Sequence, residues 1–445
     1  MMVHTAAVAN NRSGSLVVLL HACNGSAKSL ASLASLIRTQ QPGAEVFCPH
    51  LPIAKLSMAH PNSIVVGLLD DIDKKVEKAA AAGAPIDNIV FVGHSFGALL
   101  ARKLYAVACG EDAGAPRAPD YKRGGDQAVP ARQWAAKVSR IVLFAGMNRG
   151  WRISHHLSPK TAFLWAVGSA LCHLIYLFRQ RPPLVLRLRR GCEFITHLRI
   201  QSMFMRRRAQ SSGLPGGANI VQLRGSRDDI VSPEDNVDLV SGGDFIYLDV
   251  PYSGHADIVD MDEPVAGPGR RKAFLLALTG SPAEVKTASV IPSEDRFAAA
   301  DERVKNVVFV IHGIRDIGHW THKIARRIKK HATTPLTEWA TETSSYGYFP
   351  MLPFMFPGYR RQKVESLMDQ YTEALARYPR ASFSFVGHSN GTYLLAKALE
   401  LYPCCVFENV IFAGSVVRRS YDWSRFIEAE PRRINALLNL VATSD

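Results

Sequence analysis

The stretch VFVGHSFGALLARKLY, residues 90–105, decides how this chain folds. It begins with an apolar run, passes through Gly-His-Ser-Phe-Gly, and continues in a pattern typical of a helix. A Gly-x-Ser-x-Gly between a buried strand and a helix makes a sharp turn that exposes the serine hydroxyl. Its glycines are needed because the strand and the helix approach each other closely there. The stretch therefore predicts a strand, a tight turn with Ser95 at its tip, and a helix.

Short apolar runs rich in β-branched residues alternate with longer helical patterns on both sides of this stretch. They are almost wholly apolar rather than alternating, which is typical of parallel strands covered on both faces. The order predicts an α/β fold, with a mostly parallel sheet and helices on both of its faces. The candidate strands lie at 16–20, 44–49, 87–93, 139–146, 218–225 and 245–250.

The same motifs return later in the chain. FSFVGHSNGTYLLAKAL, residues 383–399, repeats the pattern around Ser95, and NVVFVIHGIR, residues 306–315, repeats the first strand with its terminal histidine. NVIFAGSVVR repeats RIVLFAGMNR with their FAG triplets aligned, and LNLVATSD repeats VQLRGSRD, which pairs Asp445 with Asp228. Repetition on this scale predicts two tandem domains rather than a solenoid of short repeats.

Alignment of the two copies sets the expected domain boundaries. We expect the first domain at 1–278 and the second at 303–445, with a linker rich in Ser, Ala and Pro at 279–302. The segment at about 151–217 has almost no counterpart in the second copy. We therefore expect it to be a cap inserted over the first sheet.

Composition excludes several classes of protein. The 445 residues are 47% hydrophobic and 21% charged, which is ordinary for globular domains and excludes wholesale disorder. The seven cysteines are scattered and never spaced as CxxC, which disfavours a disulfide scaffold or a zinc site and predicts a reducing, cytoplasmic location. No phosphate loop, His-Glu-x-x-His or dinucleotide fingerprint is present, so no metal or organic cofactor is expected.

The net charge of +14 is concentrated in one segment. Residues 151–210 hold eleven basic side chains against Glu193 alone, next to the apolar run 161–178. That run lies at the lower length limit for a membrane span, and a buried or interfacial helix with basic flanks fits it as well. Leucines rather than aromatics lie among the arginines, which favours peripheral contact with an anionic membrane over nucleic acid.

A serine nucleophile at neutral pH needs a general base, and the base needs an orienting acid. Asp228 follows the predicted strand at 218–225, and His255 lies in the loop after the next strand. The order Ser95, Asp228, His255 is the one expected when the serine lies on a strand-to-helix turn. Asp228 is preferred over Asp229 because the repeat pairs Asp228 with an aspartate of the second copy.

With these residues in place, the first copy resembles an α/β-hydrolase of the lipase and esterase kind over about 14–278. The resemblance implies an oxyanion hole formed by the backbone N–H of Phe96 and a second N–H from the loop after the first strand. That loop reads HACNG, where the family commonly has His-Gly. The second donor is therefore Cys23 or Asn24, with Cys23 preferred. As a thiol, Cys23 is interpreted as a small loop residue rather than a nucleophile.

The second copy resembles the same family without a cap. Its candidate site residues are Ser389 and Asn390 in the repeated turn, Ile314 after its first strand, and Asp445. No histidine follows Ser389 in the sequence, so no base is available at the equivalent place. Two explanations stay open: the histidine belongs to a longer chain, or this domain is a non-catalytic partner.

These observations predict a serine hydrolase that cleaves carboxylic esters through an acyl-enzyme on Ser95. His255 would act as base and then as acid, and Asp228 would orient its ring. The substrate class is a small ester or an acyl lipid. An acyltransferase with the same triad, or a binding or regulatory protein built from degenerate hydrolase domains, stays as an alternative.

Overall fold

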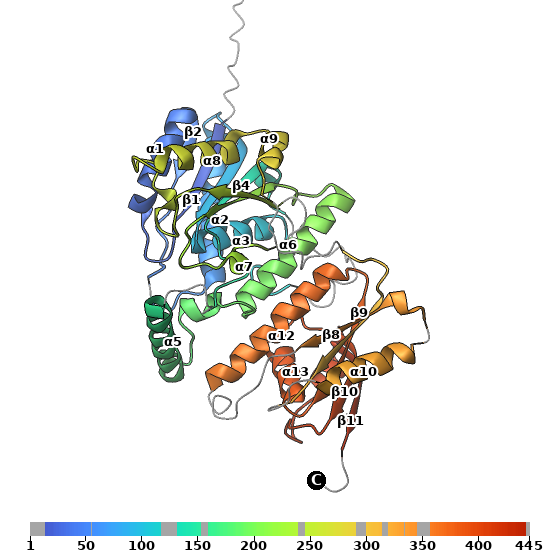
Figure 1. The fold of residues 1–445 in the computed structure, drawn as a ribbon. Coiled ribbons are helices and arrows are strands. Elements are labelled where there is room, and N and C mark those ends of the chain that lie inside the picture. Colours follow the sequence, from blue (N-terminus) through green and yellow to red (C-terminus); the bar gives the residue numbers. More distant parts are fainter. Residues whose placement is uncertain are drawn as a thin grey trace, which may run out of the picture.

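The computed structural model describes residues 14–54, 56–116, 131–152, 159–238, 245–290, 300–313, 319–332, 334–344 and 357–441. Within these ranges the chain forms two parallel sheets, one from each half, and each packs with helices. Figure 1 shows the blue-to-yellow first domain above the orange-to-red second domain. The expected α/β class and the mostly parallel sheets are confirmed.

The first sheet has six parallel strands in the order β2-β1-β3-β4-β5-β6. The strands are β1 Gly14–Leu20, β2 Ala44–Phe47, β3 Ile86–His94, β4 Val138–Phe144, β5 Asn219–Gly225 and β6 Phe245–Val250. Separate apolar clusters line its two faces, as expected for a sheet covered on both sides. One face carries α2 Pro61–Ala81, α3 Phe96–Ala108 and α6 Glu193–Ser212; the other carries α1 Ala31–Gln40 and α8 Gly267–Thr279.

The second sheet has five parallel strands in the order β11-β10-β9-β7-β8. Read from β8 to β11, this order matches that of the first sheet from β2 to β5, with no described counterpart of β6. The strands are β7 Asn306–Ile311, β8 Trp339–Ser344, β9 Ser382–His388, β10 Phe407–Ala413 and β11 Ile434–Leu440. Its helices are α10 His319–Lys330, α12 Pro357–Arg377, α13 Asn390–Leu401 and the short α14 Ser424–Ile427.

The backbone corrects one detail of the repeat. The N–H of Ser95 donates to the carbonyl of Phe144, and the N–H of Ser389 donates to that of Ala413. Strand pairing therefore equates Phe144 with Ala413, whereas alignment of the FAG triplets equates it with Phe412. The predicted alignment is therefore wrong by one residue at this strand. The hydrogen bond from the serine N–H, and not the FAG triplet, marks the equivalent residues of the two strands.

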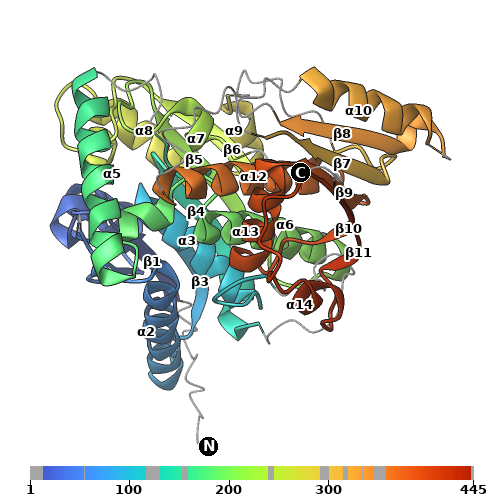
Figure 2. The same ribbon diagram turned by 90° about the horizontal axis from the view of Figure 1, so that it is seen from below.

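The segment 151–217 is not a separate cap. It contains α5 Pro159–Arg179 at the edge of the molecule and α6, which lies beside α12 between the two sheets (Figures 1 and 2). Phe194 and Leu198 of α6 belong to the first domain's apolar core, while Ile200 and Met203 belong to that of the second. Because α6 has apolar residues on two faces, it is shared between both cores.

The expected linker also begins too early. Residues Pro282–Thr287 form the helix α9, started by a capping box between Ser281 and Glu284. Val285 is buried in the core of the first domain, and the N–H of Val290 donates to the carbonyl of Tyr247. The first domain therefore extends at least to residue 290.

Much of the basic surplus is buried against the second domain. Asp369 on α12 accepts hydrogen bonds from Arg199 at 2.6 Å, Arg190 at 2.7 Å and Arg149 at 3.2 Å. A buried charge is tolerated only when it is paired and hydrogen-bonded, and this carboxylate pairs with three guanidinium groups at once. The interface is therefore specified by charge as well as by the apolar contacts of α6.

The arginine triplet that ends α6 is likewise engaged. Arg206 is buried and donates to the carbonyl of Ala218, and Arg207 donates to that of Leu375. Arg208 forms an ion pair with Glu111 at 2.6 Å. These arginines hold the fold together, so the expected membrane contact cannot rest on them.

We expect Asp369→Asn to lower the free energy of unfolding by about 3–5 kcal/mol, because three arginines lose their shared carboxylate in a buried site. Asp70→Asn is the matched control: Asp70 is exposed on α2 and makes no ion pair with any described residue. Urea denaturation of both variants measures the difference. Equal stability of the two variants would contradict the importance of this network.

Candidate active site

The turn predicted from the sequence is present between β3 and α3. Ser95 has φ 54° and ψ −112°, a backbone conformation that residues other than glycine rarely adopt. Close packing enforces it: a Cβ on Gly97 would lie 2.1 Å from the carbonyl oxygen of Leu20, and one on Gly93 would lie 2.4 Å from that of Gly97. Strands β1 and β3 and helix α3 therefore meet where only glycine fits.

Three predicted residues come together at the carboxyl ends of three strands. The Nε2 atom of His255 lies 2.9 Å from Ser95 Oγ, and its Nδ1 lies 3.1 Å from Asp228 Oδ2. Because the carboxylate accepts from Nδ1–H, Nε2 carries the lone pair that faces the serine hydroxyl. All three residues are buried, with exposed fractions of 3% for Ser95 and 7% for both His255 and Asp228.

The acid is fixed by its own loop. Asp228 Oδ1 accepts from the backbone N–H groups of Ile230 at 3.0 Å and Val231 at 2.8 Å. Burial raises the pKa of Asp228, but the hydrogen bond from His255 and these two N–H groups outweigh it and leave the pKa below its usual value. The carboxylate stays ionised beside His255, whereas Asp229 is exposed.

His94, the residue before Ser95, contacts the loop that carries the base. Its Nε2 lies 2.8 Å from the carbonyl oxygen of His255, which can only accept, so His94 donates. Burial and the neighbouring His255 lower the pKa of His94 to about 4. His94 is therefore neutral near pH 7 and holds the backbone of His255 in place.

Arg270 on α8 is a support that sequence reasoning missed. Its guanidinium is buried and donates to Ser253 Oγ at 2.9 Å, the carbonyl of Asp260 at 3.1 Å and Asp257 Oδ2 at 2.6 Å. These bonds brace the loop on both sides of His255. They also keep Asp257 away from the imidazole. In the sequence, Arg270 looks like any basic residue of a surface helix.

The loop after β1 holds the two candidates for the second N–H of the oxyanion hole, Cys23 and Asn24. The N–H of Asn24 donates to the carbonyl of Ile53 at 2.9 Å, so it is occupied. No described residue accepts from the N–H of Cys23, and Phe96, as the first residue of α3, has no intrahelical partner for its own N–H. Burial raises the pKa of the Cys23 thiol to about 11, so this thiol stays protonated.

The second domain keeps the turn, but its described residues place no histidine beside the serine. Ser389 has φ 51° and ψ −117°, almost the values of Ser95, and Asn390 begins α13 as Phe96 begins α3. No histidine of the described residues is bonded to Ser389 Oγ. Ile314 and Asp445, the other candidates for this domain, lie outside the described residues.

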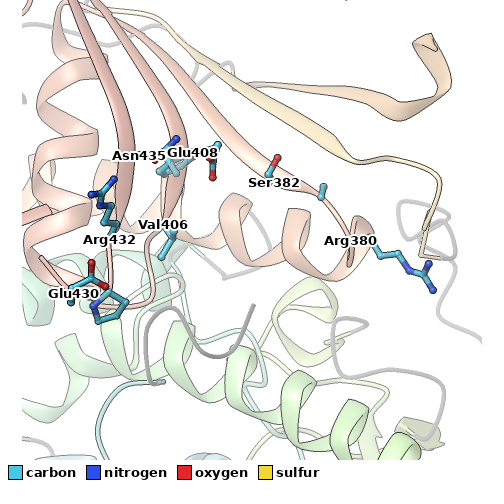
Figure 3. A pocket seen from close by; sticks show the side chains of 10 residues that line it. Arg380, Ser382, Val406, Glu408, Glu430, Arg432 and Asn435 are labelled. Carbon is cyan, nitrogen blue, oxygen red and sulfur yellow. The ribbon is translucent and has the colours of Figure 1, made fainter. Parts of the chain in front are cut away.

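A pocket of about 530 Å³ in the second domain lies at the other edge of its sheet, where β9, β10 and β11 begin (Figure 3). Its polar lining includes Arg380, Ser382, Glu408, Glu430, Arg432 and Asn435. Ser389 follows the opposite, carboxyl end of β9, so this pocket is not part of the serine site. In the described part of the chain no group of three His, Cys, Asp or Glu residues could hold a metal ion.

Strand order, the turn after β3, the acid after β5 and the histidine after β6 together decide the fold. The first domain has a fold of the α/β-hydrolase type. Solved structures similar to this chain include the phospholipase PlaB from Legionella pneumophila (10% identity, TM-score 0.41, 62% of each chain covered). A carboxylesterase of Nitrososphaera gargenis is 15% identical, with TM-score 0.34 and 62% of this chain and 93% of its own covered. Esterase B from Lactobacillus rhamnosis is 12% identical, with TM-score 0.36 and 62% and 78% covered.

These likenesses concern the α/β-hydrolase fold alone, and the chain spans about three fifths of the length of the phospholipase structure. No protein-family model matches the sequence, and no curated protein sequence matches it. The chemistry of this chain is therefore argued from its own residues.

We expect Gly97→Ala to disrupt the turn, because its Cβ would overlap the backbone of β1. The free energy of unfolding should fall by several kcal/mol, or the variant should fail to fold. Gly67→Ala is the matched control, since Gly67 lies inside α2 with open space around the position of a Cβ. It should gain about 0.5–1 kcal/mol from helix propensity alone. Thermal unfolding of both variants measures this, and equal shifts would contradict the close approach.

Proposed function

We propose that the chain is a serine hydrolase of carboxylic esters. The observation that carries this proposal is the continuous series of hydrogen bonds from Ser95 Oγ through His255 to Asp228. The hydroxyl lies within reach of a base whose free nitrogen faces it, and the base is held by an ionised acid. This is the arrangement that turns a weakly nucleophilic hydroxyl into an attacking group.

In the proposed reaction, Ser95 Oγ attacks the ester carbonyl carbon while His255 Nε2 accepts the hydroxyl proton. The carbonyl oxygen becomes an oxyanion, stabilised by the N–H groups of Phe96 and Cys23. The intermediate collapses as the alkoxide leaves with the proton from His255, and the acyl group stays on Ser95. Water, deprotonated by His255, then releases the carboxylic acid and restores the serine.

Asp228 stabilises the imidazolium that forms at His255 during both steps. The two backbone N–H groups on its other oxygen hold the carboxylate so that it can accept from Nδ1–H. Replacing such an acid lowers turnover by about 10⁴-fold in a serine enzyme with this arrangement, because the histidine loses both its orientation and its stabilising charge. His94 and Arg270 act as positioning residues, because they bind the backbone and side chains around His255.

An acyltransferase would share the acyl-enzyme and differ only in the acceptor. Product analysis in the presence of a primary alcohol separates the two reactions. Hydrolysis gives free acid as the main product, whereas transfer gives mainly the new ester. The complete triad of the first domain disfavours a purely binding role for this domain.

A fluorophosphonate probe should label the peptide that contains Ser95, and the label should be lost in Ser95→Ala and His255→Ala. Asp228→Asn should slow labelling by several orders of magnitude, because the imidazole loses its partner. Asp229→Asn is the matched control and should label at the wild-type rate, since Asp229 is exposed. Labelling that persists in Ser95→Ala, or a crippled Asp229→Asn, would contradict the assignment.

We further propose that the substrate lies at a lipid surface, and that α5 contacts it. One side of α5 packs on the protein. The rings of Trp165 and Trp151 are tilted by 49° with their centres 4.8 Å apart, and Arg189 Nη1 lies 3.0 Å from His173 Nε2. The opposite side carries large apolar side chains at helical spacing, with exposed fractions from 48% to 80%. They are Phe163, Val167, Leu171, Leu174, Leu177 and Phe178.

Charge and position favour a lipid surface as the occupant of this face. α5 contains no acidic residue, and the exposed Arg179 and Arg181 lie at its end without an ion pair to any described residue. Apolar side chains flanked by basic ones suit the boundary of an anionic bilayer. The segment that leads to α5 leaves the sheet after β4, at the edge where Ser95 lies. No helix in the described part of the chain is long and apolar enough to cross a membrane.

The double variant Leu174→Glu with Phe178→Glu should bind anionic vesicles at least about tenfold more weakly. Each substitution removes an apolar side chain that would be buried in the lipid and adds a negative charge that the anionic headgroups repel. The control is Val265→Glu with Leu336→Glu, two exposed apolar residues away from α5. Co-sedimentation at low and high salt measures both variants, and part of the binding should survive high salt. Unchanged binding in the α5 variant would remove the membrane from this account.

A further inference from the structure

A second cavity, of about 230 Å³, lies between the two domains and is separate from the serine site. The first domain contributes the starts of α2 and α6 and the loop before residue 116, and the second contributes α12 and the end of α13. It is lined by His60, Asn62, Gly114, Ala115, Arg187, Cys192, Glu193, Phe194, His197, Arg361, Leu401 and Pro403. The proposed ester hydrolysis uses none of these residues.

Two long helices begin at this cavity. α2 has 21 residues and α6 has 20, and the first residues of both line the cavity wall. The N-terminus of a helix carries a partial positive charge and N–H groups without intrahelical partners. At the start of α6, the N–H groups of Glu193 and Phe194 are in this position. At the start of α2, Pro61 has no N–H and the N–H of Asn62 already donates to His60 Nδ1, so α2 contributes its partial positive charge rather than free N–H groups. The free N–H groups of α6 and this positive helix end together favour an anion between the two helices.

One buried nitrogen that lines the cavity has no hydrogen-bond partner among the described residues. It is Nε2 of His197, a residue that is 7% exposed. A buried polar group without a partner is destabilising, so a ligand that forms a hydrogen bond with His197 would be favoured.

The charges around the cavity leave one cation unneutralised. Arg187 donates from Nε to the carbonyl of Pro182 and forms no ion pair with any described residue. Arg361, by contrast, pairs with Glu193 at 3.0 Å and Glu365 at 3.4 Å. Glu193 is the acidic residue of the lining, and this pair occupies it. The guanidinium of Arg187 is therefore available to an incoming anion.

The histidines of the cavity are held neutral by their surroundings. His60 Nδ1 accepts from the N–H of Asn62 at 3.2 Å, so its Nε2 carries the proton. Burial, together with the positive charges of Arg187 and Lys103, lowers the pKa of His60. Burial and Lys103 lower the pKa of His197 to about 3. The positive potential that disfavours an imidazolium favours an anion.

We propose that this cavity binds a small doubly charged oxyanion of the phosphate class. The guanidinium of Arg187, the imidazoles of His60 and His197 and the first-turn N–H groups of α6 would donate to its oxygens. Such an anion would satisfy buried donors of the first domain, while Arg361 of α12 stays paired with Glu193 and Glu365.

The proposal has a consequence for pH. A bound dianion raises the pKa values of His60 and of the buried Lys103, so binding takes up protons and the affinity for sulfate rises as pH falls from 8 to 6. His197, whose pKa is about 3, stays neutral over this range. The other titratable or charged groups at the cavity are Arg187, Arg361, Glu193, Cys192 and the buried Lys103 behind it. Burial lowers the pKa of Lys103 to about 7, against the opposing charges of Glu111 and Asp112. Lys103 would add to the same trend.

The test is calorimetric titration of the full chain with sulfate, phosphate and acetate at constant ionic strength. Sulfate is used for the pH series because it stays doubly charged throughout. We expect sulfate and phosphate to bind at one site per chain and acetate to bind at least about tenfold more weakly, since it carries half the charge. Arg187→Gln should weaken sulfate binding about tenfold or more, because it removes a charged donor.

The matched control is Arg179→Gln, which removes an exposed, unpaired arginine at the end of α5. It should bind sulfate as the wild type does. His60→Asn keeps an N-cap acceptor for α2 and removes the imidazole donor, so the variant should fold normally and bind more weakly. Circular dichroism checks the fold of each variant. Absence of sulfate binding, or equal binding by Arg187→Gln and Arg179→Gln, would overturn the proposal, while equal affinity for acetate would assign the site to carboxylates.

Discussion

The structure of the first domain depends on one steric constraint, the close approach of α3 to β1 at Gly97. No side chain fits between Gly97 and the carbonyl of Leu20, and the chain can enter α3 only if Ser95 adopts a positive φ. The amide of Ser95 is tied to the end of β4, so the hydroxyl is held above the carboxyl edge of the sheet. Loops that follow other strands end at the same edge, which is why residues far apart in sequence meet there.

The second domain shows which part of this arrangement is separable. It keeps the strained serine, so the backbone turn does not depend on the presence of a base. The described residues contain no counterpart of β6, whose loop carries His255, or of α8, which covers the sheet and holds that loop through Arg270. As a result, Ile411, Leu438 and Leu440 are 36%, 53% and 53% exposed, while Val142, Val221 and Leu223 at the equivalent places are buried. In the first domain, the same strand–loop–helix unit supplies the base and covers this apolar face, and the described part of the second domain has no counterpart of it.

The sequence predicted what is local and periodic. The apolar runs gave the strands, the Gly-His-Ser-Phe-Gly pattern gave the turn at Ser95, and the order of residues gave Asp228 and His255 as partners. It could not predict how α6 is shared, because a helix with apolar residues on two faces looks the same whether both faces bury in one core or in two. The surplus of arginine in residues 151–210 predicted an exposed basic surface for a similar reason. An acid that pairs with two of these arginines lies on α12, far along the chain. Arg270 was missed as a support because its partners are backbone groups and loop side chains.

The central claim is that Ser95 alone forms an acyl-enzyme. Burst kinetics with an activated aryl ester test it most directly, because the burst counts acylated serines per chain. The account predicts one equivalent of released phenol per chain, no burst in Ser95→Ala, and an unchanged burst in Ser389→Ala. A burst that persists in Ser95→Ala, or that is lost in Ser389→Ala, would contradict it.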